Sequence, residues 1–129
     1  MHYVFLIHHE PEGSADDDLE RRHEAFLARQ REEGRFVAFV QLDQPRETLF
    51  LRKPGKGAKA ALTQGPQAEA KVRLTGVLVL QCSGPEEARA LALDLPAAQD
   101  GAPVEVRPVF DLAAAVRGQG FGPYPLNVP

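Results

Sequence analysis

Cysteine, long apolar runs and excess positive charge are all scarce in this chain of 129 residues. Its single cysteine, Cys82, cannot form a disulfide within the chain, so nothing indicates an oxidising compartment. No apolar run is long enough to span a membrane, and the one near the amino terminus is too short for a signal peptide. We therefore expect a cytoplasmic protein with no membrane partner.

The charge balance excludes a second class of partner. Lys and Arg number 15 against 18 Asp and Glu, which gives a formal net charge of −3. Proteins that bind nucleic acid through its phosphates need a basic surface, so we expect no nucleic-acid partner. The densest basic cluster, residues 52–59, is spaced by glycine and proline and is typical of a solvated hairpin tip.

The short motifs that mark common enzyme chemistries are also missing. The chain has no nucleophile elbow, Walker loop, zinc-ligand spacing or dinucleotide fingerprint. The glycine-rich stretch 118–122 is followed by Pro123 and Pro125, so no helix can continue from it as in a cofactor loop. We therefore expect no cofactor and no metal site.

Hydrophobic patterning and turn residues predict an α+β, ferredoxin-like split βαβ domain with an extra β-ribbon. The domain should occupy residues 1–110, and residues 111–129 should form a C-terminal extension or arm. The expected elements, in order, are a strand (3–8), a helix ending at Gly34, a strand (36–42), a ribbon (47–52 and 58–63), a strand (75–82), a helix ended by Pro96, a strand (103–110) and a short helix (112–117).

Several strands are apolar on both faces. In the strand 36–42, Phe36, Ala38 and Val40 should share one face, with Val37 and Phe39 on the other. Helices can cover only one face of such a sheet, so something else must cover the second. A second copy of the chain is the simplest cover and predicts a twofold homodimer, while the C-terminal extension is the rival.

Four histidines are the first candidates for chemistry. His23 lies at the edge of an apolar helical stripe, where a half-buried imidazole can act as a general acid or base. The alternative is a tolerated histidine that is hydrogen-bonded to a neighbour. His8 and His9 point to opposite faces of their strand, and no recognised metal spacing joins either to His23 or Glu10.

Glu105 and Arg107 alternate with Val104 and Val106 in the last strand. If the valines face the helices, the charged pair faces the proposed dimer cleft. A guanidinium there can hold a carboxylate or an enolate oxygen. The alternative is a surface pair on an edge strand.

The segment Gln64-Gly65-Pro66-Gln67-Ala68-Glu69-Ala70-Lys71, followed by a strand that contains Gly76, resembles a degenerate form of the YCII-related (DGPF-domain) family signature. That signature reads roughly Asp-Gly-Pro-Phe-x-Glu-x-Lys. Gln64 stands where the signature has its aspartate, and an amide cannot take up a proton at ordinary pH. Gln64 is therefore excluded as an acid or base.

The resemblance implies a ferredoxin-like subunit that pairs into a dimeric α/β barrel, with a histidine in its cleft and an aspartate beside it in some branches. His23 matches that histidine by position. Asp94 is the candidate aspartate, although Leu95 separates it from the proline that usually follows directly.

Two hypotheses for function result. The first is a cofactor-free acid/base enzyme acting on a small organic acid in a dimer cleft, and the second is a non-catalytic ligand-binding or regulatory dimer. Because DGPF-type proteins are associated with extracytoplasmic-function sigma factors, the resemblance implies such a partner for the second. The candidate site residues are His23 and Asp94 for catalysis, and Arg107, Gln64, Glu69 and Lys71 for ligand binding.

Overall fold

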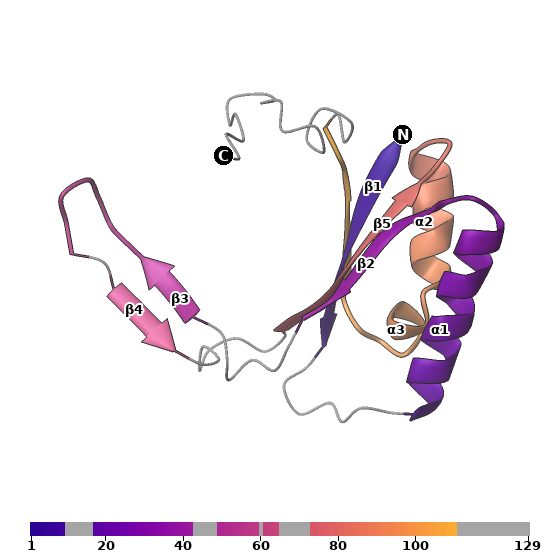
Figure 1. Ribbon diagram of the computed structural model, residues 1–129, viewed down its shortest axis with the longest axis horizontal. Helices are drawn as coiled ribbons and strands as arrows, with labels where there is room; N and C mark the ends of the chain where they lie inside the picture. Colours follow the sequence, from indigo (N-terminus) through magenta and orange to yellow (C-terminus); the bar gives the residue numbers. More distant parts are fainter. Residues whose placement is uncertain (10–16, 43–48, 60, 65–72, 111–129) are drawn as a thin grey trace.

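The computed structural model describes residues 1–9, 17–42, 49–59, 61–64 and 73–110, which form a four-stranded sheet, a two-stranded ribbon and three helices (Figure 1). No helix in these ranges has the length and apolar character needed to cross a membrane. The elements are β1 (His2–His9), α1 (Asp17–Glu32), β2 (Phe36–Gln41), β3 (Leu49–Arg52), β4 (Ala61–Gln64), β5 (Arg73–Gln81), α2 (Pro85–Asp94), α3 (Pro96–Gln99) and β6 (Val104–Pro108).

The sheet has the strand order β2-β5-β1-β6, and all three neighbouring pairs are antiparallel. The two central strands, β1 and β5, are the first and third of the four sheet strands along the chain, which is the arrangement of a split βαβ fold. The predicted ferredoxin-like α+β fold is therefore confirmed. The helices α1 and α2 cover one side of the sheet, and the β3–β4 ribbon stands off on the other side (Figure 1).

The core lies between the helices and the sheet. Tyr3, Phe5 and Ile7 of β1 are buried, while the residues between them are only half-buried, as expected for a strand with one face on the core. Leu78 and Leu80 of β5 continue the same buried layer. The helical layer adds the buried side chains Phe26, Leu27, Ala88, Leu91, Leu95 and Ala97.

The end of α1 is fixed by Gly34, as the sequence predicts. Gly34 has a φ of 76°, and the Arg35 amide donates to the Gln30 carbonyl at 2.9 Å, which is the six-residue hydrogen bond of a Schellman motif. The Arg35 Nε also donates to the buried Gln30 Oε1 at 2.8 Å. The Arg35 carbonyl accepts from the amide of Gln81 at 2.8 Å, so the helix end is joined to β5.

A second helix, α3, follows Pro96, where the sequence predicted only a helix end. α2 does stop at Asp94, because Leu95 is extended with φ −59° and ψ 126°. Proline has no amide hydrogen to lose and a φ that suits a first helical turn, so Pro96 also begins α3. The prediction was right about the end of α2 and missed α3.

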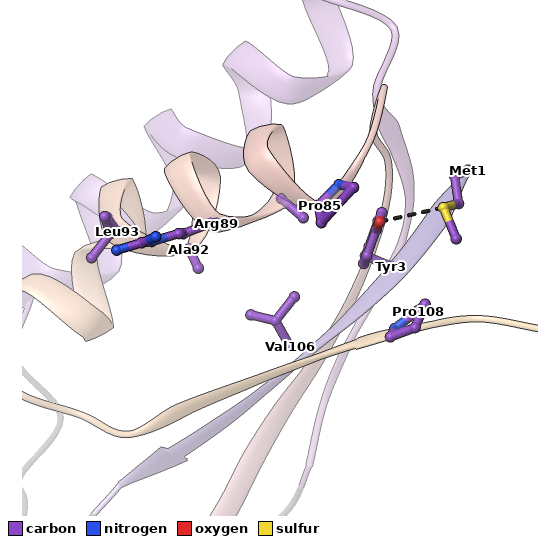
Figure 2. A pocket seen from close by; sticks show the side chains of 9 residues that line it. Met1, Tyr3, Pro85, Arg89, Ala92, Leu93, Val106 and Pro108 are labelled. Carbon is purple, nitrogen blue, oxygen red and sulfur yellow. Dashed lines mark hydrogen bonds between the residues drawn. The ribbon is translucent and has the colours of Figure 1, made fainter.

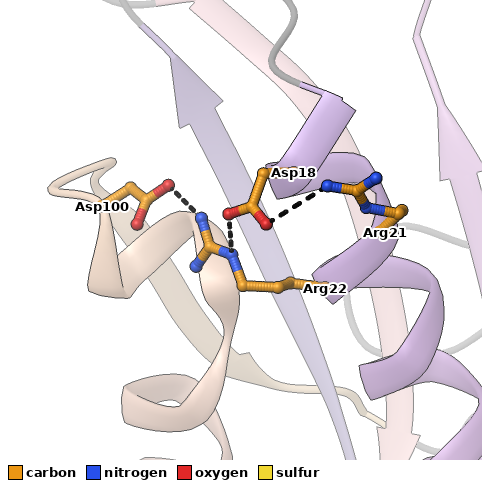
Figure 3. Close-up of polar contacts among 4 residues, drawn as sticks. All are labelled: Asp18, Arg21, Arg22 and Asp100. Atoms are coloured by element: carbon orange, nitrogen blue, oxygen red, sulfur yellow. Dashed lines mark hydrogen bonds and ion pairs between the residues drawn. The ribbon is translucent and has the colours of Figure 1, made fainter.

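Charged side chains join α3 to α1 (Figure 3). The Arg22 Nη2 donates to Asp100 Oδ2 at 2.6 Å, and its Nε donates to Asp18 Oδ2 at 2.9 Å. The Nη2 of Arg21 lies 3.6 Å from Oδ1 of Asp18. The two hydrogen bonds of Arg22 raise its pKa, and the bond to Asp100 has the larger effect. The bond to Asp100 also holds the end of α3 against the first turns of α1.

An irregularity in β2 changes which of its residues face the helices. The register with β5 shifts between Phe36 and Ala38, so that Phe36 and Phe39 both pack against the core. The prediction that Ala38 and Val40 share a face, with Phe39 on the other, is confirmed, but the prediction that Phe36 lies with Ala38 and Val40 was wrong. An extra residue in one strand reverses the alternation of every residue after it.

The side of the sheet away from the helices is apolar. We call this side the open face and define it by Val4, Leu6, Val40, Val77 and Val79. Directly paired residues of neighbouring strands share a face, and here Val79 pairs with Val4, while Val77 pairs with both Leu6 and Val40. Val40 is exposed and the other four are half-buried.

The charged pair of β6 lies on the same side as the open face. Glu105 pairs with Leu6 and Arg107 with Val4, and both charged side chains are exposed. Val104 and Val106 pack against the core. The valines therefore face the helices, which meets the condition under which the charged pair faces away from them.

Neighbouring leucines of α2 test this arrangement. Leu91 has 7% of its surface exposed and Leu93 has 66%. We expect Leu91→Ala to lower the free energy of unfolding by about 2–5 kcal/mol, because it leaves a cavity in the core. Leu93→Ala, the matched control, should change it by no more than about 0.5 kcal/mol. Urea unfolding measures both, and equal losses would contradict the placement of α2.

Candidate functional site

His23 lies in α1 at the junction of the helix layer and the sheet. Its ring centroid is 4.7 Å from that of Phe39 in β2, with the planes inclined at 60°. Its Nε2 is buried and has no hydrogen-bond partner among the described residues. A purely structural histidine would be expected to have a hydrogen-bond partner for this buried nitrogen. The described residues provide none.

Gly76 leaves the space that the Phe39 ring occupies. A Cβ atom on Gly76 would lie 3.0 Å from Cε1 and 3.3 Å from Cζ of Phe39. Such distances are shorter than ordinary carbon–carbon contacts, so any larger residue would push the ring. Gly76 in β5 thus helps to position Phe39, and through Phe39 the imidazole of His23.

A second histidine, His9 at the end of β1, is hydrogen-bonded to Thr75. The Thr75 hydroxyl lies 3.2 Å from the carbonyl oxygen of Ile7 and 2.7 Å from His9 Nδ1. The Thr75 hydroxyl donates to the Ile7 carbonyl, and its contact with Nδ1 of His9 joins the imidazole to β5.

The surroundings of His23 favour its neutral form. Burial lowers the pKa of His23 below its ordinary value of 6.5; the charge of Glu24 acts in the opposite direction, and the charge of His9 lowers the pKa further. His23 is thus a neutral imidazole at neutral pH, which can accept a proton.

The residues that the sequence proposed beside His23 are dispersed. Asp94 is exposed at the last position of α2, and the charges that act on His23 are those of Glu24 and His9. Arg107 lies on the side of the open face, whereas His23 lies on the helix side. Within the chain the structure does not bring His23 and Arg107 together. Glu69, Lys71 and the extension 111–129 lie outside the described residues, as does the side chain of Gln64.

Comparison with protein families identifies the chain. A model of the YCII-related domain matches residues 1–113. The chain belongs to the YCII-related family. The search of curated proteins finds no match. The resemblance drawn from the Gln64–Lys71 segment and Gly76 is thereby confirmed at the level of the family.

This YCII-related protein also has a cavity that the sequence did not predict. It has a volume of about 550 Å³ and lies between α2 and β6 (Figure 2). Its lining is largely apolar, with Arg89 as the charged member and a hydrogen bond of 3.3 Å from the Tyr3 hydroxyl to Met1 Sδ. The sequence signal for this cavity is the pair of small residues Ala88 and Ala92, one helical turn apart. Their spacing alone does not show which element faces them. His23 does not line this cavity, which is formed by Met1, Tyr3, Pro85, Ala88, Arg89, Ala92, Leu93, Val106 and Pro108.

The single thiol of the YCII-related protein, that of Cys82, is buried. Burial, with a smaller effect from Glu87, raises the pKa of Cys82, against the opposing charges of Arg35 and the amino terminus. A buried thiol with a raised pKa is a poor nucleophile. Cys82 therefore belongs to the core and not to a reactive site.

Two glycines provide a test of how the site is positioned. We expect Gly76→Ala to lower the free energy of unfolding by about 1–3 kcal/mol, because its Cβ overpacks against Phe39. The ring proton signals of His23 should shift in the same variant. Gly84→Ala is the matched control, since a Cβ there meets nothing within 4 Å. Urea unfolding and NMR make the comparison, and an unchanged His23 signal in Gly76→Ala would contradict the proposed role of Phe39.

Proposed function

We propose that this YCII-related protein is a cofactor-free acid/base enzyme that moves a proton on a small organic acid. The observation that carries the proposal is the Nε2 of His23, a buried nitrogen with no partner among the described residues and a lowered pKa. A neutral imidazole of this kind can remove a proton from a carbon that a neighbouring carbonyl or carboxyl group acidifies. Isomerisations and eliminations both begin with that step.

His9 is the second group of the proposed mechanism. When His23 accepts the proton, burial and the charge of His9 make its cationic form a stronger acid than an ordinary imidazolium, which favours return of the proton to the substrate or to a leaving group. The Nδ1 of His9 is engaged by Thr75, which leaves Nε2 as the nitrogen available to a substrate. In this proposal the two imidazoles serve as base and acid.

We further propose that two copies pair through the open face. Its apolar residues are exposed or half-buried in the single chain, although apolar side chains gain free energy on leaving water. Glu105 and Arg107 flank this face with opposite charges. In a twofold dimer such a pair is self-complementary, because each charge can meet its opposite on the other copy.

Hydrogen–deuterium exchange tests the catalytic proposal. A panel of small 2-oxo and unsaturated carboxylic acids is incubated with the protein in deuterated water, and exchange at carbon is followed by NMR. We expect His23→Gln to slow the exchange by about 10²–10⁴-fold, the usual contribution of a general base. The wild-type rate should fall as the pH decreases through the lowered pKa of His23, since protonation removes the base.

Two further variants provide controls for that experiment. His9→Gln should alter the pH profile, because it removes the charge that acts on His23. His8→Gln, the adjacent residue on β1, should leave rate and profile unchanged. Exchange that persists in His23→Gln at the wild-type rate would contradict the catalytic proposal.

A second candidate function follows from the position of the cavity. It is apolar and separate from His23, which favours a protein that binds a small ligand between α2 and β6 without catalysis. In that case Ala92→Phe, which fills the cavity, should abolish ligand binding in calorimetry, whereas His23→Gln should not affect it. Association with a sigma factor, as part of a regulatory role, stays a prediction of the family resemblance.

A further inference from the structure

The β3–β4 ribbon has three leucines on one face. Leu51 and Leu62 are directly paired across the ribbon, and Leu49 lies two residues from Leu51, on the same side of the strand. Their exposed fractions are 65% for Leu49, 60% for Leu51 and 63% for Leu62. The ribbon thus presents a continuous apolar surface to solvent, which we call the leucine face.

This ribbon has little internal support. Each strand has four residues, and the two pair only with each other, outside the four-stranded sheet. A two-stranded ribbon is only marginally stable by itself and needs an apolar surface to pack against. The leucine face therefore points to a partner.

The charge of the ribbon indicates what kind of partner it fits. Residues 49–64 include Arg52, Lys53, Lys56 and Lys59 and no Asp or Glu. Because the whole chain has a net charge of −3, the part outside the ribbon has a net charge of −7. A second copy of the chain thus offers an acidic body to a basic ribbon, and the same acidity disfavours an anionic membrane as the partner.

The position of the ribbon agrees with a second copy. The ribbon stands off from the sheet on the side opposite α1 and α2, which is the side of the open face (Figure 1). A copy that covered the open face would come within reach of the ribbon. By twofold symmetry its own ribbon would reach back in the same way.

We infer that the β3–β4 ribbon is a clasp, whose leucine face packs on the second copy in the proposed dimer. The inference rests on the proposed pairing through the open face and adds a second contact to it. The leucines supply the apolar contact, and the cations at the ribbon tip contact acidic side chains of the other copy.

Sedimentation measures the contribution of the clasp. The combined variant Leu49→Ser, Leu51→Ser and Leu62→Ser should raise the dimer dissociation constant by at least about tenfold, as the loss of central apolar contacts does at interfaces. Leu93→Ser, an equally exposed leucine on α2, is the matched control and should leave the constant unchanged. Circular dichroism checks that each variant is folded.

Cross-linking of the unaltered protein gives a second readout that does not depend on the variants. Three of the four lysines in the chain, Lys53, Lys56 and Lys59, lie between β3 and β4. A carbodiimide that joins amines to carboxylates is applied to a mixture of nitrogen-15-labelled and unlabelled protein. We expect links between a ribbon lysine and a body carboxylate in peptide pairs of mixed isotope, which can arise only between two copies.

The outcomes separate the clasp from the dimer on which it rests. A wild-type protein that is monomeric at all concentrations overturns both. A wild-type dimer whose dissociation constant is unchanged by the triple serine variant, without mixed-isotope links from the ribbon, overturns the clasp and leaves the open-face dimer standing. The clasp would also be overturned if the wild-type protein bound anionic vesicles through the ribbon while its dimer dissociation constant stayed unchanged.

Discussion

The contact between Phe39 and Gly76 is the constraint on which the candidate site depends. With the register shift in β2 the Phe39 ring faces the helices, and a Cβ atom at position 76 of β5 would lie 3.0 Å from this ring. The ring then lies against His23 of α1. One contact thus links two strands and a helix at the point where the only described histidine with a buried, unpartnered nitrogen is found.

Two histidines from different elements form the chemical part of the proposed site. His9 comes from the end of β1 and His23 from α1, and the charge of the first influences the pKa of the second. A second irregularity, between Ile7 and His8, falls where Thr75 binds His9. Both features are one-residue departures from regular pairing, and such bulges commonly occur next to functional sites.

Much of the fold follows from the sequence because it depends on local signals. The end of α1 at Gly34 needs only a residue that tolerates positive φ, and the core side of β5 follows from simple alternation. The sequence could not predict that Phe36 and Phe39 share one side of β2 or that His9 is hydrogen-bonded to Thr75, because each depends on the register of a neighbouring strand. The start of α3 was missed because a proline can end one helix and begin another, and only the extended Leu95 separates the two cases.

The candidate site was predictable only in part. His23 was identified from its residue type and its place on the helix, whereas the sequence proposed Asp94 and Arg107 as its companions and gave His9 no acid/base role. Sequence spacing cannot show that β6 directs Arg107 to the face opposite His23, since this depends on pairing with β1. Histidine titration by NMR tests the central claim most directly. A midpoint for His23 clearly below its ordinary value of 6.5 is expected, and a midpoint at or above that value would contradict the account.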